Sequence, residues 1–396
     1  MRGPYFLDLD TTEEMKRLFA EIGCDTAGEK IMLPKSKIVP LFLKEVKSPA
    51  ANILKQQMLS LGGEAVVGRG VVNCSQEYSD VLLLGTRQEY EGLIERICGQ
   101  PWGLKILGER IKTLWSNLAK SRKIAWEWPK QRLTLGEKTL IMGILNVTPD
   151  SFSDGGKFRE LSQAVEHAWE MVEAGADIID VGGESTRPGC LPVTAEEELQ
   201  RVRPVLERLL AEIPVPISID TYKATVAEEA LALGVQIIND VGGGLKDPRM
   251  PEVVARFQAP VIVMHNPARG EYQDLLPDLV DSLAKQVKVY EEAGLPAEKI
   301  VIDPGVGFGK NYQENLAVMK NLASFRALGQ PVLLGVSRKS FIGKTLDLPV
   351  TERLEGSLAA AAWGVIKEMD ILRVHDVRET VRLVKVLEAI KTGGSE

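Results

Sequence analysis

The chain has 396 residues, 44% of them apolar and 26% charged, a globular composition that excludes a disordered chain or a coiled coil. Its net charge of -7 and isoelectric point near 5.4 argue against a basic nucleic-acid-binding surface. Asp8 and Asp10 interrupt any apolar leader, and no apolar run approaches the ~20 residues of a membrane helix. We therefore expect a cytoplasmic protein that binds neither nucleic acid nor membrane.

Residues 1–128 carry 18 lysines and arginines against 16 aspartates and glutamates, a net charge of +2, while the remainder carries 30 against 39, a net of -9. We divide the chain there, because Pro129 is expected to end the preceding element. The patterns before it predict a small α+β domain of unassigned role. Its expected strands are 5–9, 38–46, 64–68 and 80–84, and its expected helices are 11–22, 48–61, 86–98 and 104–120.

From residue 129 to 396, short apolar runs alternate with segments of helical period. The runs are 139–145, 177–182, 215–219, 235–239, 260–264, 299–303, 331–336 and 370–374. The helical segments are 161–174, 195–212, 223–233, 249–257, 276–293, 312–327, 352–368 and 377–391. Eight such units in ~260 residues predict an α/β fold, a (β/α)8 TIM barrel. The alternative is an open doubly wound sheet, but its usual glycine-rich turn is not found after the first strand.

Polar residues follow every predicted strand, where a TIM barrel places its active site. Asp220, Asn239, Asp303 and Lys339 combine acceptors with a cation and suit a flat heterocycle that carries a guanidine-like edge beside a carbonyl. Arg373 is expected to stack on its face. Taken singly, Asp180 and Asp240 are also explained as caps or turn braces.

A second group of side chains predicts anion binding. Asn146, Arg373 and His375 are expected to meet near one point, where a phosphate and a Mg²⁺ ligated by the Asn146 oxygen would fit. Phe308 either lines the entrance or packs in the core. The other two histidines, His167 and His265, are interpreted as structural, and the four scattered cysteines (Cys24, Cys74, Cys98, Cys190) as free thiols of a reducing compartment.

The ordered motifs resemble those of one family, the dihydropteroate synthases of the pterin-binding TIM barrels. The matching segments are GILNVTPDSFSDGG (143–156), IDVGGESTRPG (179–189), ISIDT (217–221), IIND (237–240), DPG (303–305), SRK (337–339) and RVHD (373–376). The turn from Met264 to Gly270 departs from the family's usual glutamine-containing pattern, and residues 1–128 lie outside the resemblance.

The resemblance implies the condensation of 7,8-dihydropterin-6-ylmethyl diphosphate with 4-aminobenzoate to give 7,8-dihydropteroate and pyrophosphate, by a dissociative displacement. It implies a homodimer that uses Mg²⁺ and is inhibited by sulfonamides. It assigns pterin binding to Asp220, Asn239, Met264, Asp303 and Lys339, and diphosphate and metal binding to Asn146, Arg373 and His375. It assigns 4-aminobenzoate binding to Ser185, Thr186, Arg187, Pro188, Phe308, Lys339 and Ser340. The catalytic residues are expected to be Asp220, Asp303, Lys339 and Arg373.

Three alternatives remain open from the sequence. A methyltetrahydrofolate-dependent methyltransferase on the same barrel would share the aspartates and Asn239 but bind no diphosphate. A non-catalytic pterin- or folate-binding protein would normally lack the charged site residues that are present here. Residues 1–128 could also carry a second function, such as binding a neighbouring folate enzyme.

Overall fold

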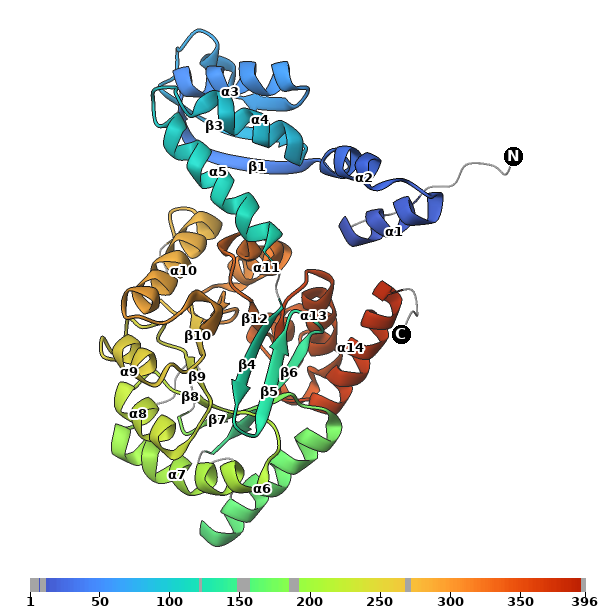
Figure 1. Ribbon diagram of the computed structural model, residues 1–396. Coiled ribbons are helices and arrows are strands. Elements are labelled where there is room, and N and C mark those ends of the chain that lie inside the picture. Colours follow the sequence, from blue (N-terminus) through green and yellow to red (C-terminus); the bar gives the residue numbers. More distant parts are fainter. Residues whose placement is uncertain are drawn as a thin grey trace. The chain divides into compact units, whose positions relative to one another are not determined.

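The computed structural model describes residues 7, 12–120, 123–147, 157–184, 192–267 and 272–392, and it divides the chain into two compact units (Figure 1). The first unit is Met1–Ser116 and the second is Asn117–Glu396. The division precedes the one we predict at residue 128, because a strand pair that follows residue 123 belongs to the barrel. Within the described residues, no helix combines the length and apolar character needed to cross a bilayer.

The first unit has a three-stranded antiparallel sheet in the order β1-β3-β2, which packs against α3 and α4. Its elements are α1 (Thr12–Ile22), α2 (Thr26–Met32), β1 (Val39–Lys47), α3 (Ser48–Leu61), β2 (Glu64–Val67), β3 (Tyr78–Gly85), α4 (Arg87–Ile97) and α5 (Leu104–Ala119). Tyr90 is fully buried, and its hydroxyl donates to the carbonyls of Val39 and Leu83, at 2.7 and 3.0 Å. The α+β prediction holds for this unit, although α2 was not predicted and most of the expected strand 5–9 lies outside the described residues.

The second unit is an eight-stranded parallel sheet in the order β11-β10-β9-β8-β7-β6-β13-β12, and a parallel bridge between Ile302 and Val332 joins its two ends. This closure confirms the TIM barrel over the open sheet. The strands are β6 (Leu140–Asn146), β7 (Ile178–Gly182), β8 (Ile217–Asp220), β9 (Ile237–Asp240), β10 (Val261–Met264), β11 (Ile300–Asp303), β12 (Leu333–Gly335) and β13 (Ile371–Val374).

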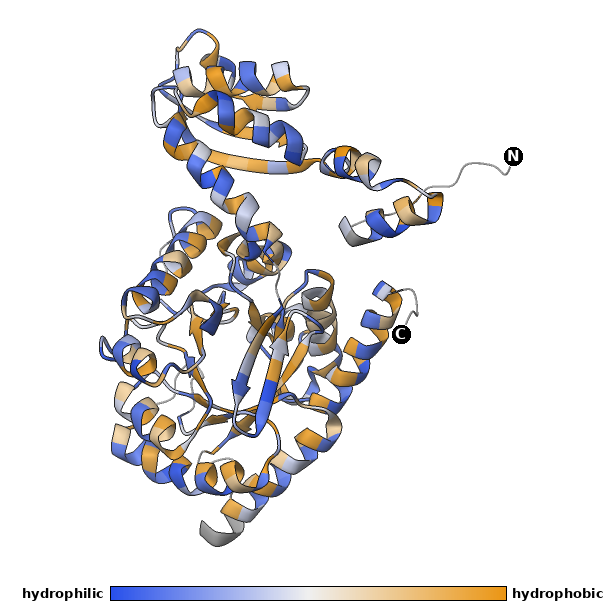
Figure 2. Cartoon of the chain, viewed as in Figure 1, coloured by the Kyte–Doolittle hydropathy of each residue, from blue (hydrophilic) through white to orange (hydrophobic). Residues whose placement is uncertain are grey.

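Most helices around the barrel alternate hydrophobic and hydrophilic residues along the ribbon, as the colours in Figure 2 show, which is the pattern of helices with one buried face. They are α6 (Lys157–Ala174), α7 (Ala195–Glu212), α8 (Ala224–Leu233), α9 (Met250–Phe257), α10 (Leu275–Glu292), α11 (Tyr312–Lys320), α12 (Ser340–Leu346), α13 (Leu354–Ile366) and α14 (Val377–Thr392). The predicted helix 312–327 is divided, because α11 ends at Lys320 and a 3-10 helix follows over Leu322–Leu328. The short α12 was not predicted.

A β-hairpin closes the N-terminal end of the barrel. Its strands are β4 (Ile124–Trp128) and β5 (Gln131–Leu135). Pro129 therefore lies in the turn of a hairpin, and our expectation that it ends a preceding helix was wrong. Trp126 is buried in one cluster with the lowest inward residues of the strands, such as Leu140 and Ile262. Its indole Nε1 donates to the carbonyl of Glu298, at 2.9 Å. The hairpin is therefore part of the barrel core.

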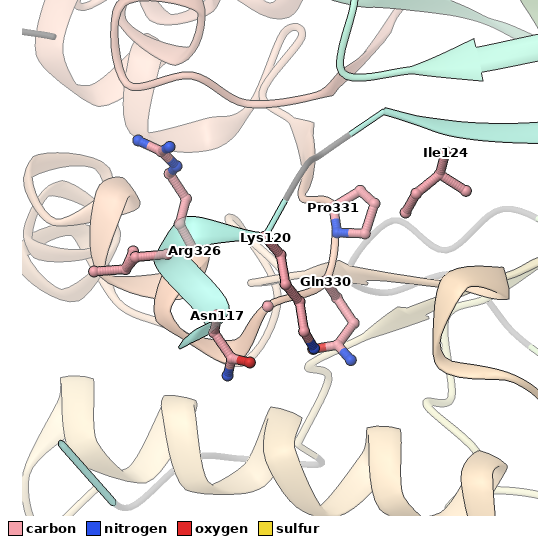
Figure 3. A pocket seen from close by; sticks show the side chains of 8 residues that line it. Asn117, Lys120, Ile124, Arg326, Gln330 and Pro331 are labelled. Carbon is pink, nitrogen blue, oxygen red and sulfur yellow. The ribbon is translucent and has the colours of Figure 1, made fainter. Parts of the chain in front are cut away.

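A small pocket of about 20 Å³ lies at this same N-terminal end (Figure 3). Asn117, Lys120, Arg326 and Gln330 line it, and the Asn117 amide donates to the carbonyl of Ala327 at 2.9 Å. That end of a TIM barrel serves stability, since the catalytic loops lie at the opposite end. The pocket has room for about one water molecule and is not a substrate site.

Candidate active site

The polar residues at the C-terminal ends of the strands point into the barrel. Side chains alternate along a strand, and Ile178, Ile237 and Ile371 lie in the inner cluster, whereas Ile179, Ile238 and Leu372 lie in the cluster beneath the helices. Residues two positions further along the inward set therefore face the barrel mouth. They are Asp180 on β7, Asn239 on β9 and Arg373 on β13, and the same alternation turns Asp220, Met264 and Asp303 inward.

The Arg373 guanidinium joins two buried carboxylates at the centre of the mouth. Its Nε donates to Asp180 and its Nη2 donates to Asp220, both at 2.6 Å. Asp180 also accepts a hydrogen bond from the Asn239 amide nitrogen, at 3.0 Å. Sequence reasoning listed Asp180 without assigning it to the site, although its position two residues after the inward Ile178 is a signal that could have placed it there.

Burial and mutual charge shift the titration of these groups. Burial raises the pKa of Asp220 to about 7, and the charge of Asp180 adds to this effect while Arg373 opposes it. Burial alone would lower the pKa of Arg373, but Asp180 and Asp220 outweigh it and raise that pKa. Arg373 is therefore a permanent cation, whereas Asp220 changes its charge near neutral pH.

Asp303 begins a glycine-rich turn that presents Phe308 to Lys339. The Asp303 carboxylate accepts from the Gly305 amide at 2.7 Å, and burial raises the pKa of Asp303. The Lys310 ammonium donates to the carbonyls of Gly305 and Phe308, at 2.9 and 3.1 Å. The Lys339 ammonium lies 4.0 Å from the centre of the Phe308 ring, a cation–π contact. Phe308 is thus at the mouth and not in the core.

Lys339 is held by its backbone at the start of α12. Arg353 donates from Nη1 to the carbonyls of Arg338 and Lys339, at 3.1 and 3.4 Å, and Ser357 accepts from the Arg338 amide at 2.9 Å. Burial lowers the pKa of Lys339 to about 8, and Arg373 adds to this while Asp303 and Asp220 oppose it. The lysine is therefore a cation at pH 7 that sits among the site carboxylates.

Asn146 and His375 line an open groove of about 730 Å³ that continues between α6 and α14. His375 contacts Ser337 through its ring Nδ1, 3.1 Å from the hydroxyl oxygen. Arg338 also lines the groove and pairs with Asp376, Nη2 to Oδ1 at 2.5 Å. The Arg373 guanidinium contacts Asp180 and Asp220, and its meeting with Asn146 and His375 at one point stays a prediction.

Of the remaining residues singled out from the sequence, some are described by the structure and others lie outside the described residues. Asp240 braces a turn, accepting from the amides of Gly242 and Gly244 and from the Tyr290 hydroxyl. His265 is buried between Ser282 and Tyr272, and burial lowers its pKa to about 4, as for a structural histidine. Exposed His167 pairs with Glu170 on α6, and Ser340 is exposed at the start of α12. Ser185, Thr186, Arg187, Pro188 and Cys190 lie outside the described residues, as does most of the departing turn after residue 267.

The donors at the groove limit how a metal could be held. Among residues that the structure describes, no three or more aspartates, glutamates, histidines or cysteines are arranged around one metal position. Asn146 is partly exposed at the end of β6, and an amide oxygen is a hard ligand. Mg²⁺ commonly keeps several waters and binds through substrate phosphates. The residues present thus fit a Mg²⁺ that is held mainly by a phosphorylated substrate.

Comparisons with known proteins identify the family of the barrel. The model of the family "Pterin binding enzyme" matches residues 142–375. The dihydropteroate synthase of Bacillus subtilis is 53% identical over 262 residues, which cover 66% of this chain and 92% of that protein. A dihydropteroate synthase structure from Clostridium difficile, obtained in the presence of pteroic acid, has a TM-score of 0.64 and 50% identity over 65% of this chain and 98% of that chain.

Two further relatives extend the comparison. A Yersinia pestis dihydropteroate synthase structure with a sulfonamide drug has a TM-score of 0.63 and 39% identity, covering 68% of this chain and all of that chain. A probable bifunctional folylpolyglutamate synthase/dihydropteroate synthase of Halobacterium salinarum is 41% identical over 412 residues. That alignment covers 99% of this chain and 49% of the relative, so it includes the N-terminal unit.

The barrel, its polar mouth and the family match define the class: the chain belongs to the pterin-binding enzymes. The match to the Bacillus subtilis enzyme covers nearly all of that protein at 53% identity. The chain is accordingly a transferase with the activity of a dihydropteroate synthase.

Proposed function

We propose that the mouth residues divide the dihydropteroate synthase reaction between a pterin pocket and a diphosphate groove. In the pocket, Asp220, Asn239 and Asp303 accept hydrogen bonds from the pterin N–H groups, and Lys339 donates to its carbonyl or ring nitrogen. Met264 packs against the ring. The observation that carries the assignment is the buried cluster in which Arg373 joins Asp220 to Asp180 and thereby to Asn239.

The diphosphate lies in the groove that Asn146 and His375 line. Asn146 would hold Mg²⁺, which when bound neutralises charge on the leaving diphosphate. His375 donates to a phosphate oxygen from its ring Nε2, since its Nδ1 contacts Ser337. Arg373 stabilises the developing negative charge from the pterin side.

The chemistry that suits these residues is a dissociative displacement. The C–O bond to the diphosphate breaks first, and the bonding electrons leave with the diphosphate. The positive charge that develops on the pterin is stabilised by Asp220 and Asp303. The amine of 4-aminobenzoate then forms the new C–N bond and loses a proton. Since an arylamine is neutral at pH 7, it needs little help from a general base.

The proposed 4-aminobenzoate site includes residues that the structure describes and a segment outside the described residues. Phe308 and Lys339 lie together at the mouth, and we assign Ser340 and the segment 185–188 to the same site. A sulfonamide mimics the arylamine, so we expect it to compete with 4-aminobenzoate and not with the pterin diphosphate. We also propose that the chain acts as a homodimer.

The rival methyltransferase binds no diphosphate, and the groove at Asn146 and His375, with Arg338 on its wall, favours the synthase. The deciding experiment measures pyrophosphate released from the pterin diphosphate with Mg²⁺, with and without 4-aminobenzoate. We expect release that requires the arylamine and yields dihydropteroate. Lys339→Ala should reduce kcat/KM by more than 100-fold, whereas Lys344→Ala, an exposed lysine on the same helix, should not. Near-normal turnover by Lys339→Ala would contradict the assignment.

A further inference from the structure

Asp180 is buried more completely than Asp220 or Asp303, the carboxylates beside it at the mouth. Its side chain is fully buried, and its Oδ2 accepts from both Arg373 Nε and Asn239 Nδ2. Its other oxygen, Oδ1, has no hydrogen-bond partner among the described residues, and the same is true of the buried hydroxyl of Ser218, which pairs in register on β8. Among the described residues, the charge of Asp180 is therefore balanced through Oδ2 alone, by the pair with Arg373.

We propose that Asp180 is a positioning residue that sets the ligand specificity of the pterin pocket by fixing the amide of Asn239. This inference rests on the proposed function, which places Asn239 against the pterin. A carboxylate paired with Arg373 only accepts hydrogen bonds, so the Asn239 amide must turn its nitrogen to Asp180. Its oxygen is then left as the acceptor for the ligand. Position 239 consequently selects an N–H on the ring and rejects a carbonyl there.

The selection depends on the charge of Asp180 and not on its size. An asparagine at position 180 has nearly the same shape but both donates and accepts, so Asn239 could bind it in either orientation. Asn239 would then present a donor or an acceptor to the ligand as required. A site rejects a mismatched ring strongly only when binding of that ring leaves buried polar groups of the site without hydrogen-bond partners. The variant should therefore bind amino and oxo rings with similar affinity.

The test takes Asn239 to face the 2-substituent of the ring. It compares pterin, which has a 2-amino group and an unprotonated N1, with lumazine, which has a 2-oxo group and an N1–H. Their affinities are measured by isothermal titration calorimetry on the full chain at pH 7.5, without 4-aminobenzoate. We expect the unmodified chain to prefer pterin by at least about ten-fold, and Asp180→Asn to lose most of that preference. Asp180→Ser also removes the charge and should give the same loss of preference. It serves as the second variant if Asp180→Asn does not fold.

The matched control is Asp240→Asn, which removes another buried carboxylate, adjacent to Asn239 but bound to a turn and to Tyr290. It should lower stability and leave the pterin-to-lumazine ratio unchanged. An unchanged ratio in both Asp180 variants would overturn the inference while the pocket assignment stands. Failure of the unmodified chain to bind pterin would instead refute the proposed function, and the inference with it.

Discussion

Replacing Arg373 with methionine should destabilise the chain by an amount that grows with pH. The guanidinium bonds to Asp180 and Asp220 at 2.6 Å each, and both carboxylates are buried. Methionine fills similar space but leaves the two carboxylates without their cation. Removing one partner of a buried ion pair costs roughly 3–5 kcal/mol, because the remaining charge is uncompensated.

The pH dependence follows from Asp220. Its native pKa of about 7 lies above the ordinary value of 3.8, so the folded chain holds this proton more tightly than the unfolded chain. Such a group favours folding at low pH, and its contribution is lost as pH rises from about 4 to 7. Arg373 lowers this pKa, so the variant raises it further and extends the loss above pH 7. Each additional unit in the pKa of Asp220 lowers the unfolding free energy of the variant by about 1.4 kcal/mol, once Asp220 is ionised in both the variant and the unmodified chain.

Urea unfolding of both chains at pH 6.0 and pH 8.5 measures the effect. We expect the loss of unfolding free energy in Arg373→Met to be larger at pH 8.5 by at least about 1 kcal/mol. The control is Arg338→Met, whose guanidinium is 40% exposed and pairs with Asp376, so it should cost less than about 1 kcal/mol at both pH values. Equal losses for Arg373→Met at the two pH values would refute the argument.

Two further substitutions and one pH profile test other parts of the fold and site. In Gly305→Ala the new Cβ would lie 2.0 Å from the His265 carbonyl oxygen, at a φ of +64°, so we expect at least about 2 kcal/mol of destabilisation in urea. Trp126→Ala should cost about 3–5 kcal/mol through the cavity at the barrel base, yet leave both KM values unchanged in kinetic assays. The kcat/KM should fall below pH 7 as Asp220 protonates and above pH 8 as Lys339 loses its proton, so a flat profile from pH 6 to 9 would contradict these roles.

The barrel was predictable because each of its strands is buried on both faces. Such strands are continuous apolar runs, and the eight predicted runs lie within a few residues of the observed strands. The hairpin at the base was missed for the opposite reason, since β4 and β5 alternate exposed and buried residues around Glu127 and Arg132. In the sequence, Trp126 and Trp128 were interpreted as lying at the boundary between the two domains. Only packing against the barrel base shows that Trp126 belongs to the core.

The site was predictable to the extent that strand ends decide position. Reading those ends found Asp220, Asn239 and Asp303, because these residues lie at or next to the last position of their strands and on the inward-facing set. Asp180 was listed among the polar strand-end residues but was not assigned to the site, because a single carboxylate there is also explained as a cap or a turn brace. Alternation is the better criterion, since Ile178 points inward and Asp180 must then do so as well. Applied to β13, it places Arg373 on the inner surface, whereas His375 lies just beyond the strand end.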